Sequence, residues 1–248
     1  MDVVGKVMGS FNADALKEPR GFIKILQWIL SIFAFATTTS VNTQLSFYAK
    51  CGEGLDSMRQ EASVSYPFRI EDQKYEIPLC RNASESVDVK YAPYVGGSAS
   101  AAEFYVFVGV IVFLYCMAAL ILYIFFDDQY RKNNLFSIGD FVISCVLTAL
   151  WLISSAAWAQ GLVNLKYDTD LAESDLYRRI QDCLIYGCVQ DVLPNFASLN
   201  VSIIFGFLNM VVWGGNLWFL YKETPWFKVQ SKPPTSPTQG QDIEPQRI

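Results

Sequence analysis

Histidine is absent from the 248-residue sequence, and charged residues make up only 17% of it. The absence of histidine excludes histidine-based acid–base catalysis, serine–histidine triads and imidazole ligation of metals. The sequence also lacks a glycine-rich phosphate loop and the ligand spacing of a metal site. Its net charge of −5 argues against nucleic-acid binding, which requires clustered lysine and arginine. We therefore expect a protein that is not an enzyme, binds no nucleic acid and needs no metal or cofactor.

Charge is scarcest in the long apolar segments. A helix needs about 20 mostly apolar residues to cross the hydrocarbon core of a bilayer, which is roughly 30 Å thick. Four segments meet this requirement, at residues 22–43, 103–126, 139–160 and 199–222. Lys24, Glu103 and Asp140 lie at segment ends, where we expect their side chains to reach the lipid headgroups. The sequence therefore predicts an all-α integral membrane protein with four transmembrane helices.

Lysine and arginine in the connections predict the orientation. They lie before the first span, in the short turn after the second and behind the fourth, as Lys17, Arg20, Arg131, Lys132, Lys222 and Lys228. Because such residues are enriched on the cytoplasmic side, both termini are predicted to be cytoplasmic. We expect a cytoplasmic N-terminal segment at 1–21, a membrane domain at 22–222 and a flexible cytoplasmic tail at 223–248. Within the membrane domain, the connections are a luminal loop at 44–102, a cytoplasmic turn at 127–138 and a second luminal loop at 161–198.

The first span has an alternative interpretation. Ala34-Phe35-Ala36 follows an apolar run and resembles a signal-peptide cleavage site. Cleavage there would leave three spans and a luminal N-terminus. The segment before the apolar run is longer than a usual signal-peptide n-region, so we favour an uncleaved first span.

The cysteines support luminal loops. Cys51 and Cys80 lie in the first long loop, and Cys183 and Cys188 lie in the second. Two cysteines in each loop, with both loops on one side, fit one disulfide within each loop in an oxidising compartment. Pairing across the loops is the alternative that the sequence leaves open. We expect structural bridges rather than a redox site.

Two sequons occur in the sequence, one inside a luminal loop and one at the start of the fourth span. Asn82-Ala-Ser84 lies inside the first loop and is a candidate glycosylation site. Asn200-Val-Ser202 adjoins the fourth span, too close to the bilayer for efficient modification.

Both loops show patterns of short elements. The segments Val64–Ile70 and Tyr75–Leu79 have the composition of strands, with prolines that confine them to sheet edges. They predict a small disulfide-stapled β element. In the second loop, apolar residues recur at helical spacing from 176 to 184 and predict a short amphipathic helix that packs on its own loop.

The fourth span carries small and polar residues on one face. Gly206, Asn209, Trp213 and Asn216 recur at steps of three and four residues. Asparagine needs a hydrogen-bond partner in hydrocarbon, and glycine lets two backbones approach closely. We expect this face to pack against another helix or a partner, and a pore lining is the alternative.

Several longer motifs resemble the synaptophysin family. They are Glu18-Pro-Arg-Gly-Phe-Ile-Lys-Ile-Leu-Gln-Trp28, Tyr66-Pro-Phe-Arg69, Trp151-Leu-Ile-Ser-Ser-Ala-Ala-Trp-Ala-Gln-Gly-Leu162, Phe205-Gly-Phe-Leu-Asn209, Trp213-Gly-Gly-Asn-Leu-Trp218 and Lys222-Glu-Thr-Pro-Trp226. The likeness extends from Lys17 to Trp226. It implies a MARVEL-type four-span bundle of synaptic or other cytoplasmic transport vesicles, with disulfides Cys51–Cys80 and Cys183–Cys188. It also implies binding of membrane lipids including cholesterol, self-association into a homo-oligomer, and binding of a vesicle SNARE of the synaptobrevin type.

The tail departs from the neuronal members of that family. They end in Tyr-Gly-Pro-Gln repeats, which this chain lacks, so tail-driven vesicle clustering is not expected. The expected function is that of a non-catalytic vesicle protein that organises the membrane and sorts or regulates SNARE partners in exocytosis. One alternative is an oligomeric channel or transporter with Asn209 and Asn216 lining its pore. Another is a junction protein, although neither loop carries the tryptophan or cysteine pattern of such proteins.

Overall fold

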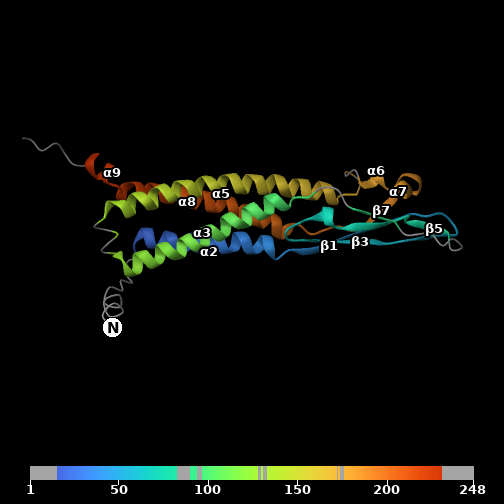
Figure 1. Ribbon diagram of the computed structural model, residues 1–248, viewed down its shortest axis with the longest axis horizontal. Coiled ribbons are helices and arrows are strands. Elements are labelled where there is room, and N and C mark those ends of the chain that lie inside the picture. The colour runs from blue at the N-terminus through green and yellow to red at the C-terminus, as the bar shows by residue number, and fades with distance from the viewer. Residues whose placement is uncertain are drawn as a thin grey trace, which may run out of the picture.

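The computed structural model describes residues 16–82, 90–93, 97–127, 130, 133–171, 173 and 176–230. The described chain is elongated, with long helices at one end and β strands at the other (Figure 1). Residues 1–15, Arg131 and Lys132 of the predicted turn, and the tail from 231 to 248 lie outside the described residues. The expectations for those segments therefore stay predictions.

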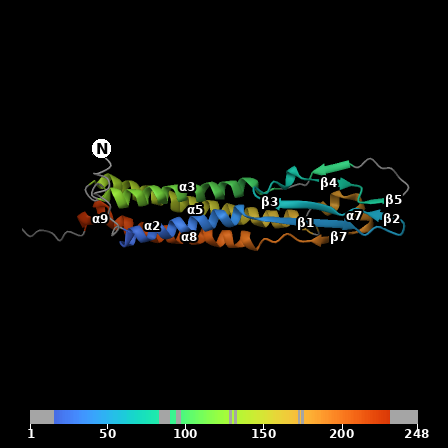
Figure 2. The same cartoon turned by 90° about the horizontal axis from the view of Figure 1, so that it is seen from below.

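Four long helices form a bundle. They are α2 (Pro19–Thr39), α3 (Ala99–Phe125), α5 (Asn134–Thr169) and α8 (Ala197–Glu223). Each is long and apolar enough to cross a membrane. α2 packs against α3 and α8, and α5 packs against α3 and α8, so the helices lie side by side (Figure 2). The predicted four-helix membrane architecture is confirmed.

The third long helix extends further than hydropathy indicated. α5 has 36 residues and ends at Thr169 rather than at residue 160. At 1.5 Å per residue it measures about 54 Å, well above the roughly 30 Å of a hydrocarbon core. Leu162, Leu165 and Thr169 in its last turns are buried on one face. The segment 161–198, predicted as a loop, therefore begins as helix, because packing beyond the bilayer sustains it.

A sheet joins the two long connections. The chain leaves α2 and enters β1 (Asn42–Ala49) after two residues. β1 lies between β3 (Gln60–Ser65) and β7 (Cys188–Val192) and is antiparallel to both. The sequence predicted a β element near β3 but not β1 or β7. The span predicted at 22–43 thus includes the beginning of a strand.

Shorter elements complete the region beyond the bundle. They are the paired strands β2 (Leu55–Ser57) and β5 (Cys80–Asn82), the paired strands β4 (Lys74–Ile77) and β6 (Lys90–Pro93), the 3₁₀ turn η2 (Ile70–Asp72), and helices α6 (Leu176–Arg179) and α7 (Gln181–Tyr186). The amphipathic helix predicted around 176–184 is therefore two short helices, separated at the buried Ile180. A last short helix, α9 (Pro225–Gln230), follows α8 at the opposite end of the molecule (Figure 1).

The bundle buries polar side chains among apolar ones, whereas many large apolar side chains lie on its outside. Its buried polar residues include Gln27, Ser31, Ser144, Ser154, Ser155, Ser202, Asn209 and Asn216. Its exposed large apolar residues include Phe33, Phe107, Leu114, Val146, Ile153, Ile204, Val211 and Trp218. Such a distribution is unfavourable in water and suits helices whose outer faces contact lipid.

Candidate functional site

A buried ion pair lies inside the bundle, near the helix ends that are remote from the sheet. Lys24 is on the second turn of α2 and Asp140 is on the second turn of α5. The Lys24 Nζ lies 3.3 Å from the Asp140 Oδ1, and the two side chains are 0% and 7% exposed. The expectation that these side chains reach the headgroups is wrong, because each finds its counter-charge within the bundle instead.

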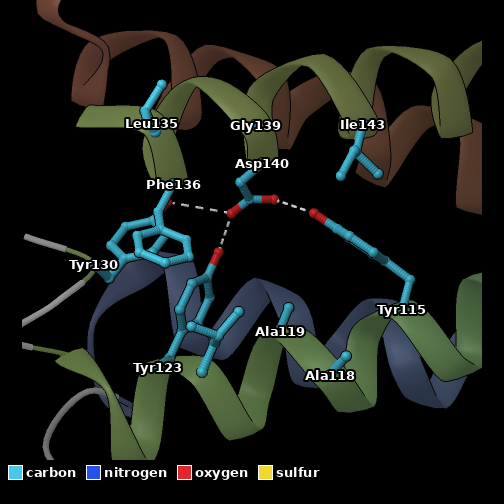
Figure 3. A pocket seen from close by; sticks show the side chains of 11 residues that line it. Tyr115, Ala118, Ala119, Tyr123, Tyr130, Leu135, Phe136, Gly139, Asp140 and Ile143 are labelled. Carbon is cyan, nitrogen blue, oxygen red and sulfur yellow. Dashed lines mark hydrogen bonds between the residues drawn. The ribbon is translucent and has the colours of Figure 1, made fainter. Parts of the chain in front are cut away.

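Three tyrosines solvate the carboxylate of this pair. Tyr115 and Tyr123 of α3 and Tyr130 of the following connection donate hydrogen bonds from their hydroxyl groups to Asp140 (Figure 3). The hydroxyl of Ser144, one turn further along α5, adds a contact of 3.3 Å. A buried charge is tolerated only when it is paired and hydrogen-bonded. Lys24 therefore supplies the counter-charge of Asp140, and the tyrosines supply its hydrogen bonds.

The ammonium group of Lys24 lies among aromatic rings. Its Nζ is 4.9 Å from the ring centroid of Tyr115 and 4.7 Å from that of Trp213 on α8. Cation–π attraction to such rings is worth about 2 kcal/mol when the cation is desolvated. Through these contacts the pair connects all four long helices.

A second layer of charge lies closer to the helix ends. The guanidinium of Arg20 is 2.6 Å from Asp127 and 2.9 Å from Glu18, and its side chain is buried. The same group lies over the rings of Tyr123 and Tyr130 at 5.3 and 5.0 Å. The Arg20 layer and the Lys24 layer together close this end of the bundle.

A cavity of about 180 Å³ adjoins the ion pair, between α3 and α5. Its walls are Ala118, Ala119, Leu122, Leu135, Phe136, Gly139 and Ile143, and its polar base consists of Tyr115, Tyr123, Tyr130 and Asp140. Figure 3 shows Tyr115 and Tyr123 rising toward Asp140 from the α3 ribbon below it, and Tyr130 reaching toward it from the left. Small residues make the hollow, since a Cβ atom on Gly139 would meet no atom within 4 Å.

The fourth-span face predicted from the sequence lies inside the bundle. Gly206, Asn209, Trp213 and Asn216 are all buried. A Cβ atom on Gly206 would lie 2.8 Å from the ring of Tyr105 and still closer to Ser155, so glycine is required for this helix contact. The amide of Asn209 donates to the backbone oxygen of Leu30 on α2. These residues thus contact the protein's own helices.

Aromatic side chains close the end of the bundle that faces the sheet. Phe68, from the Tyr66-Pro-Phe-Arg69 motif, stacks on Trp158 of α5 at 5.4 Å between ring centroids. The Trp158 indole donates to the hydroxyl of Ser202 on α8. Arg69 forms a 2.6 Å ion pair with Glu103 on the first turns of α3. The motif therefore fastens the first long connection onto the bundle.

Two disulfides lie at the end of the sheet that is remote from the bundle, where Cys188 begins β7. The bridges are Cys51–Cys80 and Cys183–Cys188, as the resemblance implied. The backbone N–H of Cys80 donates to the carboxylate of Asp182, beside Cys183, at 2.7 Å. The two bridged loops are thereby joined. The free cysteines within the described residues, Cys116 and Cys145, lie in α3 and α5.

The two bridges are expected to differ in their contribution to stability. Chain-entropy arithmetic gives about 3.6 kcal/mol for the Cys51–Cys80 bridge, with its separation of 29 residues, and about 2 kcal/mol for Cys183–Cys188, with its separation of 5. Paired serine substitutions, C51S/C80S and C183S/C188S, should lower the free energy of unfolding in that order. Titration of the purified variants with denaturing detergent measures both, and the reverse order would contradict the entropic account.

The glycosylation candidate Asn82 is exposed at the end of β5, next to the first bridge. Ser84 of its sequon lies outside the described residues. No group of three or more histidine, cysteine or acidic side chains within the described part of the chain is arranged to hold a metal ion.

The ion pair was the main feature that sequence reasoning missed. The sequence pattern that indicates it is a polar face on the first span. Lys24, Gln27 and Ser31 recur there at helical steps, and all three are buried. A polar stripe on a transmembrane helix faces protein rather than lipid. That stripe indicates that Lys24 points inward.

Four apolar helices that enclose buried charge define a multi-pass membrane protein. The sequence model of the MARVEL family, described as a membrane-associating domain, matches residues 15–219. The match covers most of the 248 residues and all four long helices but for the end of α8. The chain belongs to the MARVEL family.

Proposed function

We propose that this protein is a non-catalytic organiser of vesicle membranes that recruits other membrane proteins through its lipid-facing surface. Its partners would be a vesicle SNARE of the synaptobrevin type and further copies of itself, and its outer helix faces would contact cholesterol. The vesicle location and these partners follow from the resemblance to the synaptophysin family. Both termini would lie in the cytoplasm.

The closure of the bundle at both ends is the observation that carries this proposal. The Arg20 and Lys24 layers close one end, and the stack of Phe68 on Trp158 closes the other. Each buried cation at one end is paired with a carboxylate, which is a structural role rather than a catalytic one. A bundle that is closed at both ends acts on its surroundings through its outer surface.

The outer face of α8 is the best candidate for partner contact. Ile204, Val211 and Trp218 on this face are 65%, 60% and 56% exposed. Between Val211 and Trp218 lies Gly214, where a Cβ atom would meet nothing within 4 Å. Glycine on a lipid-facing helix lets the backbone of a second transmembrane helix approach closely. The partner surface thus lies opposite the buried face that the sequence suggested.

A pull-down from vesicle-enriched membranes in mild detergent tests this function. Gly214→Leu should reduce recovery of the vesicle SNARE about tenfold, since it fills the place of an approaching helix. Gly139→Leu is the matched control, because an added Cβ atom at Gly139 also meets no atom within 4 Å, but Gly139 lies on α5 and away from the α8 surface. Equal SNARE recovery by wild type and Gly214→Leu, or no recovery from wild type, would overturn the proposal.

The orientation has its own test in the glycan at Asn82. With both termini cytoplasmic, the exposed Asn82 lies in the lumen and carries one N-linked glycan. Glycosidase treatment should therefore increase the gel mobility of the wild-type protein and leave Asn82→Gln unchanged. Protease applied to intact vesicles should remove a C-terminal tag. A protected tag would contradict the proposed orientation.

A channel is the second candidate, and unpaired polar atoms inside the bundle favour it. Both side-chain polar atoms of Gln27 and of Asn216 are buried without a hydrogen-bond partner. Such groups suit bridging by ordered water. The sealed ends nevertheless predict that liposomes containing the purified protein remain impermeable to protons and small ions. Steady single-channel currents would favour the channel instead.

A further inference from the structure

The cavity between α3 and α5 opens on the outer surface of the bundle. Its rim residues Leu135, Phe136 and Ile143 are 73%, 39% and 43% exposed, and they belong to a helix that can cross a membrane. Nothing in the described structure covers this rim. We therefore infer that a molecule in the bilayer enters the cavity sideways, between α3 and α5.

The base of the cavity offers only hydrogen-bond acceptors. Tyr115, Tyr123 and Tyr130 each have one hydroxyl hydrogen, and all three donate it to Asp140 (Figure 3). Their oxygen atoms keep lone pairs, and the ionised carboxylate has no hydrogen to donate. The hydroxyl of Tyr130 makes the longest hydrogen bonds of the three tyrosines, 3.3 Å to Asp140 and 3.4 Å to Glu223. A ligand must bring a donor to this base.

Charge excludes the commonest lipid heads. A phosphate or a fatty-acid carboxylate would meet the Asp140 carboxylate and three phenol oxygens without a donor among the residues that line the cavity. Lys24 pairs with Asp140 but does not line the cavity. Burial of an anion beside an anion is strongly unfavourable. A cationic head would leave a net positive charge buried, because Lys24 already pairs with Asp140, so the remaining candidates are neutral heads with a free hydroxyl.

The size of the cavity restricts the ligand further. A cavity of about 150 Å³ in another protein holds one benzene molecule. The present volume of about 180 Å³ therefore accommodates the head of a lipid and a few carbons of one chain, and it is too small for a four-ring sterol.

We propose that this cavity binds a neutral lipid with a free hydroxyl head and an acyl chain, of the diacylglycerol or ceramide class. The hydroxyl donates to the phenol oxygens or to Asp140, and the first carbons of one chain lie against Ala118, Ala119 and Gly139. This site depends only on the membrane-spanning fold. It is independent of partner recruitment at the α8 surface.

Photolabelling of the full-length protein in lipid nanodiscs tests the site. The probes are diazirine-bearing diacylglycerol, ceramide, fatty acid and sterol, and labelled peptides are identified by mass spectrometry. Diacylglycerol or ceramide should label peptides from α3 and α5 at least about fivefold more than the fatty acid, the ratio that one hydrogen bond supports. The stronger of the two probes identifies the class of lipid.

Three variants make the test specific. Gly139→Leu fills the cavity and should reduce labelling at least about tenfold, whereas Gly214→Leu should leave it unchanged. Tyr130→Phe removes one acceptor with little change of volume and should reduce labelling about fivefold. Equal labelling by the fatty acid, sterol as the strongest probe at this site, or no effect of Gly139→Leu would each overturn the proposal. Because Gly139→Leu and Tyr130→Phe lie outside α8 and leave its outer surface intact, failure here is distinguishable from failure of partner recruitment.

Discussion

Replacing Lys24 with methionine is expected to lower the free energy of unfolding by about 3–5 kcal/mol. The change removes the only cation within 4 Å of Asp140 among the described residues, and it leaves a carboxylate charged inside the bundle. Asp140→Asn alone should also destabilise, because it leaves the Lys24 ammonium without its counter-charge. Both variants should be measured by titration with denaturing detergent.

The double mutant Lys24→Met/Asp140→Asn distinguishes the contribution of charge pairing to stability from that of side-chain packing. The amide oxygen at position 140 still accepts a hydrogen bond from one tyrosine, the amide nitrogen can donate to the hydroxyl oxygen of the other, and no buried charge remains. It should therefore recover most of the lost stability, with an interaction free energy of about 2 kcal/mol or more. Lys222→Met is the control, since Lys222 is exposed near the end of α8 and should cost less than about 1 kcal/mol. Additive effects in the double mutant would contradict the structural role of the pair.

Replacing Trp158 with alanine is expected to cost about 3–5 kcal/mol, because a fully buried side chain leaves a cavity. Phe68 loses the ring on which it stacks, and Ser202 loses the indole N–H that it accepts. The first long connection should then separate from the bundle, so limited proteolysis near Phe68 should become faster.

Two further variants isolate the causes. Trp158→Phe keeps a ring for stacking and loses the hydrogen bond, so it should cost about 1–3 kcal/mol. Trp218→Ala removes an equally large side chain from the lipid-facing side of α8 and should cost much less. If Trp218→Ala destabilises as much as Trp158→Ala, the burial of Trp158 is not the cause of the stability lost in Trp158→Ala.

The spans were predictable from the sequence because bilayer thickness sets their length. The end of α5 was not, since hydropathy reports where lipid ends and not where a helix ends. β1 was missed because one of its partners, β7, lies about 140 residues further along the chain. Pairing at such a distance leaves no local pattern in either strand.

The candidate site, too, could be predicted only in part from the sequence. Lys24 and Asp140 were recognised as charges near span ends, but position alone does not tell whether a side chain points to the headgroups or to a partner helix. The face of Gly206, Asn209, Trp213 and Asn216 was recognised from its spacing. Which helices it contacts depends on how four spans are arranged, and periodicity does not encode that arrangement.

Site-specific photocrosslinking in native vesicles tests the central claim most directly, namely that the protein acts through the outside of a closed bundle. A photoreactive residue replacing Val211, which is 60% exposed, should yield adducts with a vesicle SNARE. The same residue replacing Leu147, which is buried in α5, should crosslink only within the chain. SNARE adducts from the buried position, or none from Val211, would contradict the account.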